Sequence, residues 1–233
     1  MRKKHQQAFV LLFVGCLSAA LLLLAVPRLM GALAMLPGDN GLEQLRAGRQ
    51  ITLGGIERLL DSRRAALGWV DDAETHRDIG AVLLALASSD IPRATSNDEL
   101  AERAKDELLR GLALAPVQAE GWDLLVTAEL GLGDVQEAVQ ALRLSYRSNP
   151  HAGSLARVRT PKAMLLWDDL DAPLRAQVQR ELRSLFRREP RAAVDAAIHA
   201  QGLNKVLREA LQDDQAALQR LEKIVKSLET ARS

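Results

Sequence analysis

The fold is decided by residues 116–150, PVQAEGWDLLVTAELGLGDVQEAVQALRLSYRSNP. On both sides of a central Gly-Asp pair, apolar side chains recur every three or four residues, which predicts two helices that each bury one face. Gly133 favours the end of the first helix, and Asp134 with Glu137 three residues later is typical of a capping box that starts the second. Because Pro150 stops the second helix, the stretch predicts a helical hairpin.

This hairpin resembles a tetratricopeptide repeat (TPR), a helix-turn-helix unit of about 34 residues, and residues 117–150 match it best. The matching positions lie on both helices, in the turn and at the end: Trp122, Leu125, Gly133, Asp134, Ala138, Leu142 and Pro150. The resemblance implies an all-α fold in which TPR-like repeats stack into an α-solenoid. An ordinary antiparallel helix pair stays open as the alternative, because Val126, Glu129 and Ser145 depart from the family pattern.

The composition favours helices and argues against a nucleic-acid partner. Apolar residues make up 48% of the 233 residues but aromatic ones only 3%, so burial depends mainly on Ala, Leu and Val. Such a composition suits closely packed helices better than an aromatic-rich β sandwich. With 31 basic and 30 acidic side chains, the protein has no net field to attract a phosphate backbone. The single cysteine, Cys16, excludes an intrachain disulfide.

The N-terminus contains a segment that is predicted to span a membrane. Residues 8–26 carry no charge, and these nineteen residues at about 1.5 Å each span roughly 28 Å, close to the thickness of the bilayer hydrocarbon core. The basic residues of the segment 1–7 precede the span, whereas only Arg28 closely follows it. The positive-inside rule therefore predicts a single-pass protein of the bacterial inner membrane, with a cytoplasmic N-terminus and a periplasmic C-terminal domain.

Two features bear on whether this segment is retained. Phe13-Val-Gly-Cys16 resembles a lipoprotein box, but the chain stays apolar for ten residues beyond it. Ala32-Leu-Ala34 has the form of a signal cleavage site, but it follows an apolar run that is longer than the usual length of about 7–15 residues. We expect residues 8–26 to be retained as an anchor.

Beyond the anchor, the sequence predicts a linker and then one helical domain. Residues 27–41 form the linker, because Pro37-Gly-Asp-Asn-Gly41 is a cluster of turn-forming residues. Residues 42–233 form the TPR-like helical domain. Gly54-Gly55 is expected to interrupt its first helix, and Thr160-Pro161 is expected to start a later one.

The C-terminal helix, expected over residues 203–228, has two alternative roles. Its apolar residues are spaced by seven, three, four and three: Leu211, Leu218, Leu221, Val225 and Leu228. This spacing suits either a cap that packs back on the helical array or a short coiled coil that forms a homodimer.

The sequence offers no pattern that points to catalysis, a metal ion or a cofactor. The four histidines are far apart and form no His-x-x-x-His pair, and no Gly-x-Ser-x-Gly motif is present. The doublets Asp168-Asp169 and Asp213-Asp214 are expected to be solvated caps, because neighbouring helix residues point in different directions. We therefore expect no catalytic residue, no metal site and no bound cofactor.

These observations predict a non-catalytic scaffold or protein-binding module of the cell envelope. Glu120, Asp123 and Thr127 lie away from the Trp122 side of their helix, so we expect them to face a protein partner in a concave groove. Replacing Glu120 or Asp123 by alanine should then change stability by no more than about 0.5 kcal/mol.

The stretch at residues 167–190 points to a more specific role. It resembles segments of small membrane-anchored helical-repeat proteins from bacterial surface-polysaccharide clusters. The resemblance implies a role in polysaccharide biosynthesis or export. The alternatives are a subunit of a cytochrome-maturation or transport complex, and a cryptic glycan-modifying enzyme.

Overall fold

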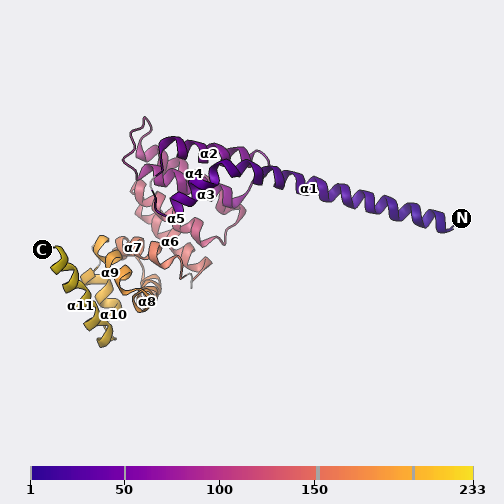
Figure 1. Ribbon diagram of the computed structural model, residues 1–233. Helices are drawn as coiled ribbons and strands as arrows, with labels where there is room; N and C mark the ends of the chain where they lie inside the picture. Colours follow the sequence, from indigo (N-terminus) through magenta and orange to yellow (C-terminus); the bar gives the residue numbers. More distant parts are fainter. Residues whose placement is uncertain (1, 50, 151–152, 201–202, 233) are drawn as a thin grey trace.

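The computed structural model describes residues 2–49, 51–150, 153–200 and 203–232, and over these ranges the chain forms helices and no strand. The helices (Figure 1) are, in chain order, α1 (Arg2–Arg46), α2 (Leu53–Leu67), α3 (Ala73–Ala87), α4 (Asn97–Leu114), α5 (Ala119–Leu132), α6 (Val135–Ser148), α7 (Ala156–Leu165), the 3-10 helix η1 (Trp167–Asp169), α8 (Ala172–Arg188), α9 (Pro190–His199), the π-helix η2 (Leu203–Leu207), α10 (Arg208–Leu211) and α11 (Gln215–Arg232). The side chains of the basic segment 1–7 lie outside the described residues.

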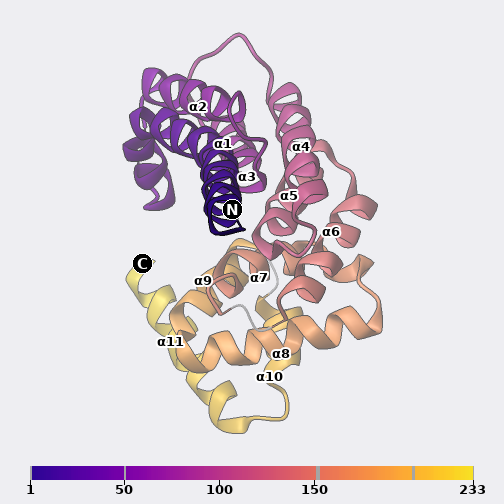
Figure 2. The same ribbon diagram turned by 90° about the vertical axis from the view of Figure 1, so that its right-hand side faces the viewer.

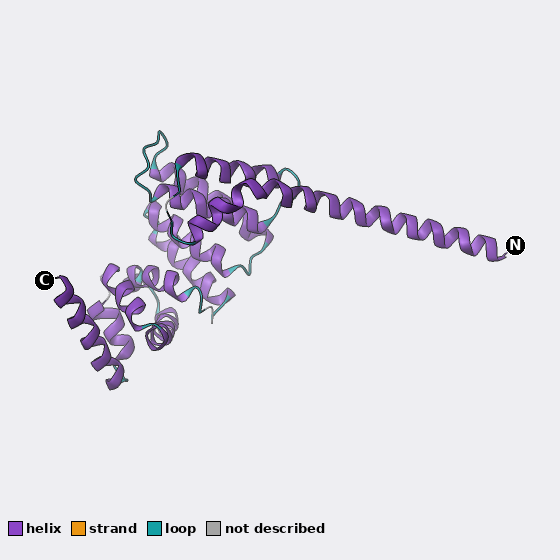
Figure 3. Ribbon diagram, viewed as in Figure 1, coloured by secondary structure: helices purple, strands orange, loops and turns teal. Residues whose placement is uncertain are grey.

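The first six helices pack as three successive antiparallel pairs. α1 lies against α2, α3 against α4, and α5 against α6, and α4 also packs on α5. Beyond α6, α7 to α11 form a second group in which α7 contacts both α8 and α9 (Figure 2). Buried apolar side chains from Leu42 to Leu221 form one core under both groups. The prediction of an all-α fold is confirmed for the described residues (Figure 3).

The predicted central hairpin is confirmed as α5 and α6. α5 ends at Gly133, whose φ of 79° lies in the left-handed region that glycine adopts without strain. Asp134 then caps α6 by accepting a hydrogen bond from the backbone N–H of Glu137 at 3.3 Å. α6 ends at Ser148, two residues before Pro150. The hairpin buries three positions predicted for its core, Leu125, Ala138 and Leu142.

Trp122 lies at the edge of this hairpin and is not fully buried between its helices. The side chain is partly buried against the core, and its ring N–H donates to the backbone oxygen of Pro116 at 2.8 Å. Small side chains such as Ala128 and Ala138 fill the centre instead, and both are fully buried. Trp122 therefore fastens the start of α5 to the preceding loop, with its apolar body inside and its polar tip bonded to the backbone.

α1 is one long helix where an anchor and a linker were predicted. It is long and apolar enough to cross a membrane, and its most apolar part is not buried by the rest of the protein. The helix continues through Pro37–Gly41, so the prediction of a linker over residues 27–41 is wrong. A Cβ at Gly38 would lie 3.1 Å from the Cα of Leu59. The glycine thus serves close helix packing, because α1 and α2 approach each other where Gly38 has no side chain.

The helical structure is interrupted after α1, and α2 itself is continuous. Gly48 has a φ of 65°, and the hydroxyl of Thr52 accepts a hydrogen bond from the backbone N–H of Gly55 at 3.2 Å. Gly54-Gly55 therefore lies in the first turn of α2, so the prediction that this pair interrupts a helix is wrong. The N-cap at Thr52 satisfies an amide at the start of the helix, where glycine costs little.

Adding one methyl group at Gly38 is expected to lower the free energy of unfolding by about 1–3 kcal/mol. Gly38→Ala would place a Cβ 2.1 Å from Oγ of Ser62 and 3.1 Å from Cα of Leu59, so α1 and α2 would have to separate. Gly54→Ala is the matched control, because no atom lies within 4 Å of a Cβ there and alanine favours a helix. Urea denaturation of the full-length protein in detergent would measure both variants. Equal stabilities would show that α1 and α2 are not closely packed at Gly38.

Two further predictions of helix ends are wrong. Thr160-Pro161 lies inside α7, which begins at Ala156, because burial of this helix in the core offsets the hydrogen bond that the proline cannot donate. The helix expected over residues 203–228 is divided before α11, where Asp214 accepts a hydrogen bond from the N–H of Ala217 at 2.9 Å. α11 packs back against α9 and α10 and buries Leu221, as in the first of the two alternatives for this segment.

Candidate functional site

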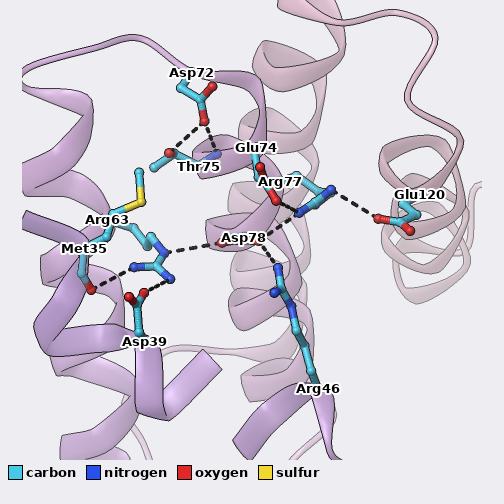
Figure 4. Close-up of polar contacts among 10 residues, drawn as sticks. All are labelled: Met35, Asp39, Arg46, Arg63, Asp72, Glu74, Thr75, Arg77, Asp78 and Glu120. Atoms are coloured by element: carbon cyan, nitrogen blue, oxygen red, sulfur yellow. Dashed lines mark hydrogen bonds and ion pairs between the residues drawn. The ribbon is translucent and has the colours of Figure 1, made fainter. Parts of the chain in front are cut away.

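A buried arginine of α2, Arg63, connects α1 to α3 at the centre of a polar network (Figure 4). Its side chain is only 2% exposed. The guanidinium donates to the backbone oxygen of Met35 at 3.0 Å and to the carboxylate of Asp39 at 2.8 Å, both on α1. On α3 it donates to the carboxylate of Asp78 at 3.4 Å. Carboxylates from two helices therefore balance a buried charge, which fixes the three helices relative to one another.

The carboxylate of Asp78 accepts hydrogen bonds from three arginines. Arg46 at the end of α1 donates at 3.1 Å, Arg63 of α2 at 3.4 Å, and Arg77 of α3 at 3.3 Å. The Asp78 side chain is 8% exposed, so this carboxylate lies almost entirely within the protein. Three guanidinium groups from three helices therefore meet at one carboxylate.

Arg77 extends the network from α3 to α5. Its guanidinium donates to Glu74 at 2.8 Å and to Glu120 at 3.1 Å. Burial alone would lower the pKa of Arg77, but the negative charges of Asp78 and Glu74 outweigh that effect and raise the pKa above its ordinary value. Glu120 is thereby connected to a residue of α3 that lies 43 positions earlier in the chain.

A pocket of about 410 Å³ opens over this network between α1, α2 and α3. Its lining combines five carboxylates with two guanidinium groups and three uncharged side chains: Asp39, Glu43, Asp72, Glu74, Asp78, Arg46, Arg63, Met35, Leu42 and Thr75. Asp72 is used as the cap of α3, because it accepts from the N–H and the hydroxyl of Thr75 at 2.9 and 3.0 Å. Glu43 and Glu74 are exposed at the rim. Arg46 is also exposed there, and Glu74 pairs with Arg77. With five carboxylates against two guanidinium groups, the lining as a whole suits a cationic group, such as a lysine or arginine side chain of a partner.

The structure separates the three residues that were predicted to face a partner. Glu120 is exposed and belongs to the edge of the network through Arg77. Asp123 is only 3% exposed, and its carboxylate accepts from the ammonium of Lys162 at 2.6 Å. Thr127 is partly buried, and its hydroxyl donates to the backbone oxygen of Asp123 at 3.4 Å. The prediction that Asp123 faces an open groove is therefore wrong, and of the three residues only Glu120 presents an exposed carboxylate.

Asp123 is buried because α7 covers it with Lys162. The ammonium of Lys162 also donates to the backbone oxygen of Asp123 at 2.8 Å. Burial lowers the pKa of Lys162, while the negative charge of Asp123 opposes that shift. The two residues are 39 positions apart, so no local pattern in the sequence could show the pair.

A second buried network, which no sequence pattern indicates, joins α6, α7 and α8. Arg159 of α7 is fully buried and donates to the carboxylate of Glu181 on α8, at 3.2 Å from its Nε, and to the backbone oxygen of Ser145 at 3.2 Å. The hydroxyl of Tyr146 donates to the same carboxylate at 2.5 Å, and the guanidinium lies 3.8 Å from the centre of the tyrosine ring. Burial, followed by the negative charge of Glu181, raises the pKa of Tyr146 well above its usual range. This network holds the two helix groups together.

Elsewhere in the described chain, the largest of the other pockets is apolar, and no metal cluster is found. A pocket of about 550 Å³ lies where α1 ends, α2 begins and α3 ends, and apolar side chains dominate its lining: Leu45, Ile51, Ile56, Val82, Ile91 and Pro92. Among the described residues, no group of three or more His, Cys, Asp or Glu side chains could hold a metal ion.

In comparisons with known proteins, no protein-family model and no curated protein sequence matches this chain. The comparison with TPR proteins therefore depends on the residues of the α5–α6 hairpin and on the antiparallel pairing of the helices around it.

Proposed function

We propose that this protein is a non-catalytic binding module, anchored by α1 in the bacterial inner membrane, whose TPR-like helices hold a protein partner on the periplasmic side. The observation that supports this most directly is the continuity of α1. The helix that is apolar enough to cross a membrane also supplies Met35, Asp39 and Leu42 to the lining of the charged pocket. The anchor and the pocket therefore share one helix, which fixes the position of the pocket relative to the membrane. A flexible linker would not fix it.

The geometry of α1 restricts where a partner can lie. Asp39 follows the last residue of the apolar run, Val26, by 13 positions, and at about 1.5 Å per residue this places the pocket roughly 20 Å beyond the membrane core. A partner in the pocket therefore lies close to the membrane surface. The acidic rim selects a segment that carries a basic side chain. Such a partner fits an envelope assembly, and we propose surface-polysaccharide biosynthesis or export as the process it serves.

Site-specific photocrosslinking in intact membranes tests this proposal. A photoreactive residue at Glu43, on the rim, is expected to give one discrete adduct with another envelope protein. The matched control is the same residue at Glu222 of α11, whose side chain is 63% exposed and lies far from the pocket in the chain. Charge reversal at the rim by Glu74→Arg is expected to reduce the adduct about tenfold, which corresponds to about 1.4 kcal/mol. The same adducts at Glu43 and Glu222, or no effect of the charge reversal, would contradict the proposal.

A further inference from the structure

The α2–α3 loop lies beside α1 just after the apolar run ends. A Cβ at Gly31 of α1 would be 3.7 Å from the backbone oxygen of Ala66, 3.8 Å from Cβ of Trp69 and 3.9 Å from a methyl group of Val70. Gly31 follows Val26 by five residues, which is about 7–8 Å along a helix. The polar headgroup layer on each side of the hydrocarbon core is about 5–8 Å thick. If α1 stands across the bilayer, Trp69 is held at the depth of the headgroups.

Large apolar side chains at this end of the domain are exposed. Trp69 is 50% exposed, and on α1 the side chains of Leu29 and Leu33, one helical turn apart, are 59% and 49% exposed. Apolar surface of this kind, next to a membrane-spanning segment, is favourable in contact with lipid and costly in water. Tryptophan in particular is enriched at membrane interfaces, because its ring is apolar and its N–H is polar.

A second loop brings more apolar surface to the same end. α4 ends beside the start of α3, since a Cβ at Gly111 would lie 2.9 Å from the backbone oxygen of Ala73. Leu114, the last residue of α4, is 49% exposed, and Val117 in the α4–α5 loop that follows is 76% exposed. Figure 1 shows both loops on the side from which α1 leaves the domain, and Figure 2 looks onto that side along α1.

We propose that this end of the domain rests on the outer surface of the bilayer that α1 crosses, with Trp69 as an interfacial anchor and with Leu29, Leu33, Leu114 and Val117 in contact with lipid. Arg28, the first charged residue after the apolar run, follows Val26 by two positions and marks the edge of the hydrocarbon core on this side.

The charges at this end determine which lipid surface it accepts. Asp71, two residues after Trp69, is 70% exposed, and Glu120 follows Val117 on the next helix with 55% exposure. These carboxylates oppose attraction to anionic headgroups. The contact is therefore made by apolar insertion, and it forms on zwitterionic phosphatidylcholine. It requires α1 to act as the anchor, as in the proposed function, and it does not depend on the protein partner.

The test is a depth measurement on the full-length protein in phosphatidylcholine vesicles. In a Cys16→Ala background, an environment-sensitive fluorophore is attached at Trp69→Cys, and quenching by lipid that carries a nitroxide near the headgroup is compared with quenching by iodide in water. The matched control is Leu53→Cys, which is also exposed but lies at the other end of α2, about 20 Å away. We expect lipid quenching at position 69 to exceed that at position 53 at least about twofold, with the opposite order for iodide.

Each other outcome identifies what is wrong. If iodide quenches the label at position 69 as strongly as the label at position 53, this end of the domain faces water and the proposal is overturned. A label that neither quencher reaches would show that a second copy of the protein covers the surface, which also overturns it. A label at Leu22→Cys, in the apolar part of α1, reports the anchor itself. Loss of lipid quenching there would instead mean that α1 does not span the bilayer, and the membrane anchoring of the proposed function would fail with it.

Discussion

Replacing Arg159 by alanine is expected to lower the free energy of unfolding by about 3–5 kcal/mol. Arg159 is fully buried and pairs with Glu181, whose carboxylate also accepts from the hydroxyl of Tyr146. Without the guanidinium, the Glu181 charge would remain in the interior with no cation beside it, and the contact with the tyrosine ring would be lost. The loss is a large part of the roughly 5–15 kcal/mol that stabilises a typical domain. Urea denaturation of the full-length protein in detergent, followed by circular dichroism, measures it.

Arg157 on the same helix provides the matched control. It pairs with Glu189 at the surface, where its side chain is 62% exposed. Arg157→Ala is therefore expected to cost no more than about 1 kcal/mol. Combining Arg159→Met with Glu181→Gln removes both buried charges at similar volume, and it is expected to recover most of the stability lost in Arg159→Ala. If Arg159→Ala were no more destabilising than Arg157→Ala, the buried pair would not be what joins α7 to α8.

The parts of the fold that the sequence predicts are those that depend on neighbouring residues. Gly133 ends a helix and Asp134 starts the next because both effects act within one turn of backbone. Ser96 and Asp171 act equally locally as N-caps, because each accepts a hydrogen bond from the amide three residues ahead. The buried stripe of the α5–α6 hairpin is also a local pattern, since it needs only the helical period.

Gly38 shows why the residues next to it in the sequence could not predict that α1 continues as a helix. Proline, glycine, aspartate and asparagine side by side are typical of a turn, yet the same glycine permits two helices to touch. The choice between these outcomes depends on α2, which lies some twenty residues away. One sequence pattern does indicate the close packing of α1. Its small residues are spaced by three and four, which places them on one helix face: Gly31, Ala34, Gly38 and Gly41.

The charged networks were beyond prediction for a different reason. Arg63 and Asp78 are 15 residues apart, and Arg159 and Glu181 are 22 residues apart. With basic and acidic residues present in nearly equal numbers throughout the chain, each arginine has many candidate partners. Which pair becomes buried is decided by how the helices stack, and the sequence specifies that only through the whole core. The exposed rim of the charged pocket follows from the same stacking.

Asp123→Ala is expected to lower the free energy of unfolding by about 3–5 kcal/mol, although the sequence alone predicted near neutrality. The carboxylate of Asp123 is buried and lies 2.6 Å from the ammonium of Lys162, whose side chain is only 16% exposed. Alanine would leave that ammonium in the interior with the backbone oxygen as its remaining partner. Burial already lowers the pKa of Lys162, and removing the carboxylate that opposes this effect would lower it further.

A double-mutant cycle separates this pair from simple loss of packing. Glu120→Ala, three residues earlier on α5, removes an exposed carboxylate and is expected to change stability by no more than about 0.5 kcal/mol. Lys162→Met removes the other charge and keeps the apolar stem, so the variant with both Asp123→Ala and Lys162→Met is expected to be more stable than Asp123→Ala alone. Urea denaturation of the wild type, Asp123→Ala, Lys162→Met and the double variant gives the coupling free energy of the pair. A coupling near zero, or equal effects of Asp123→Ala and Glu120→Ala, would mean that Asp123 faces water after all, as the position of both residues on one helix had first indicated.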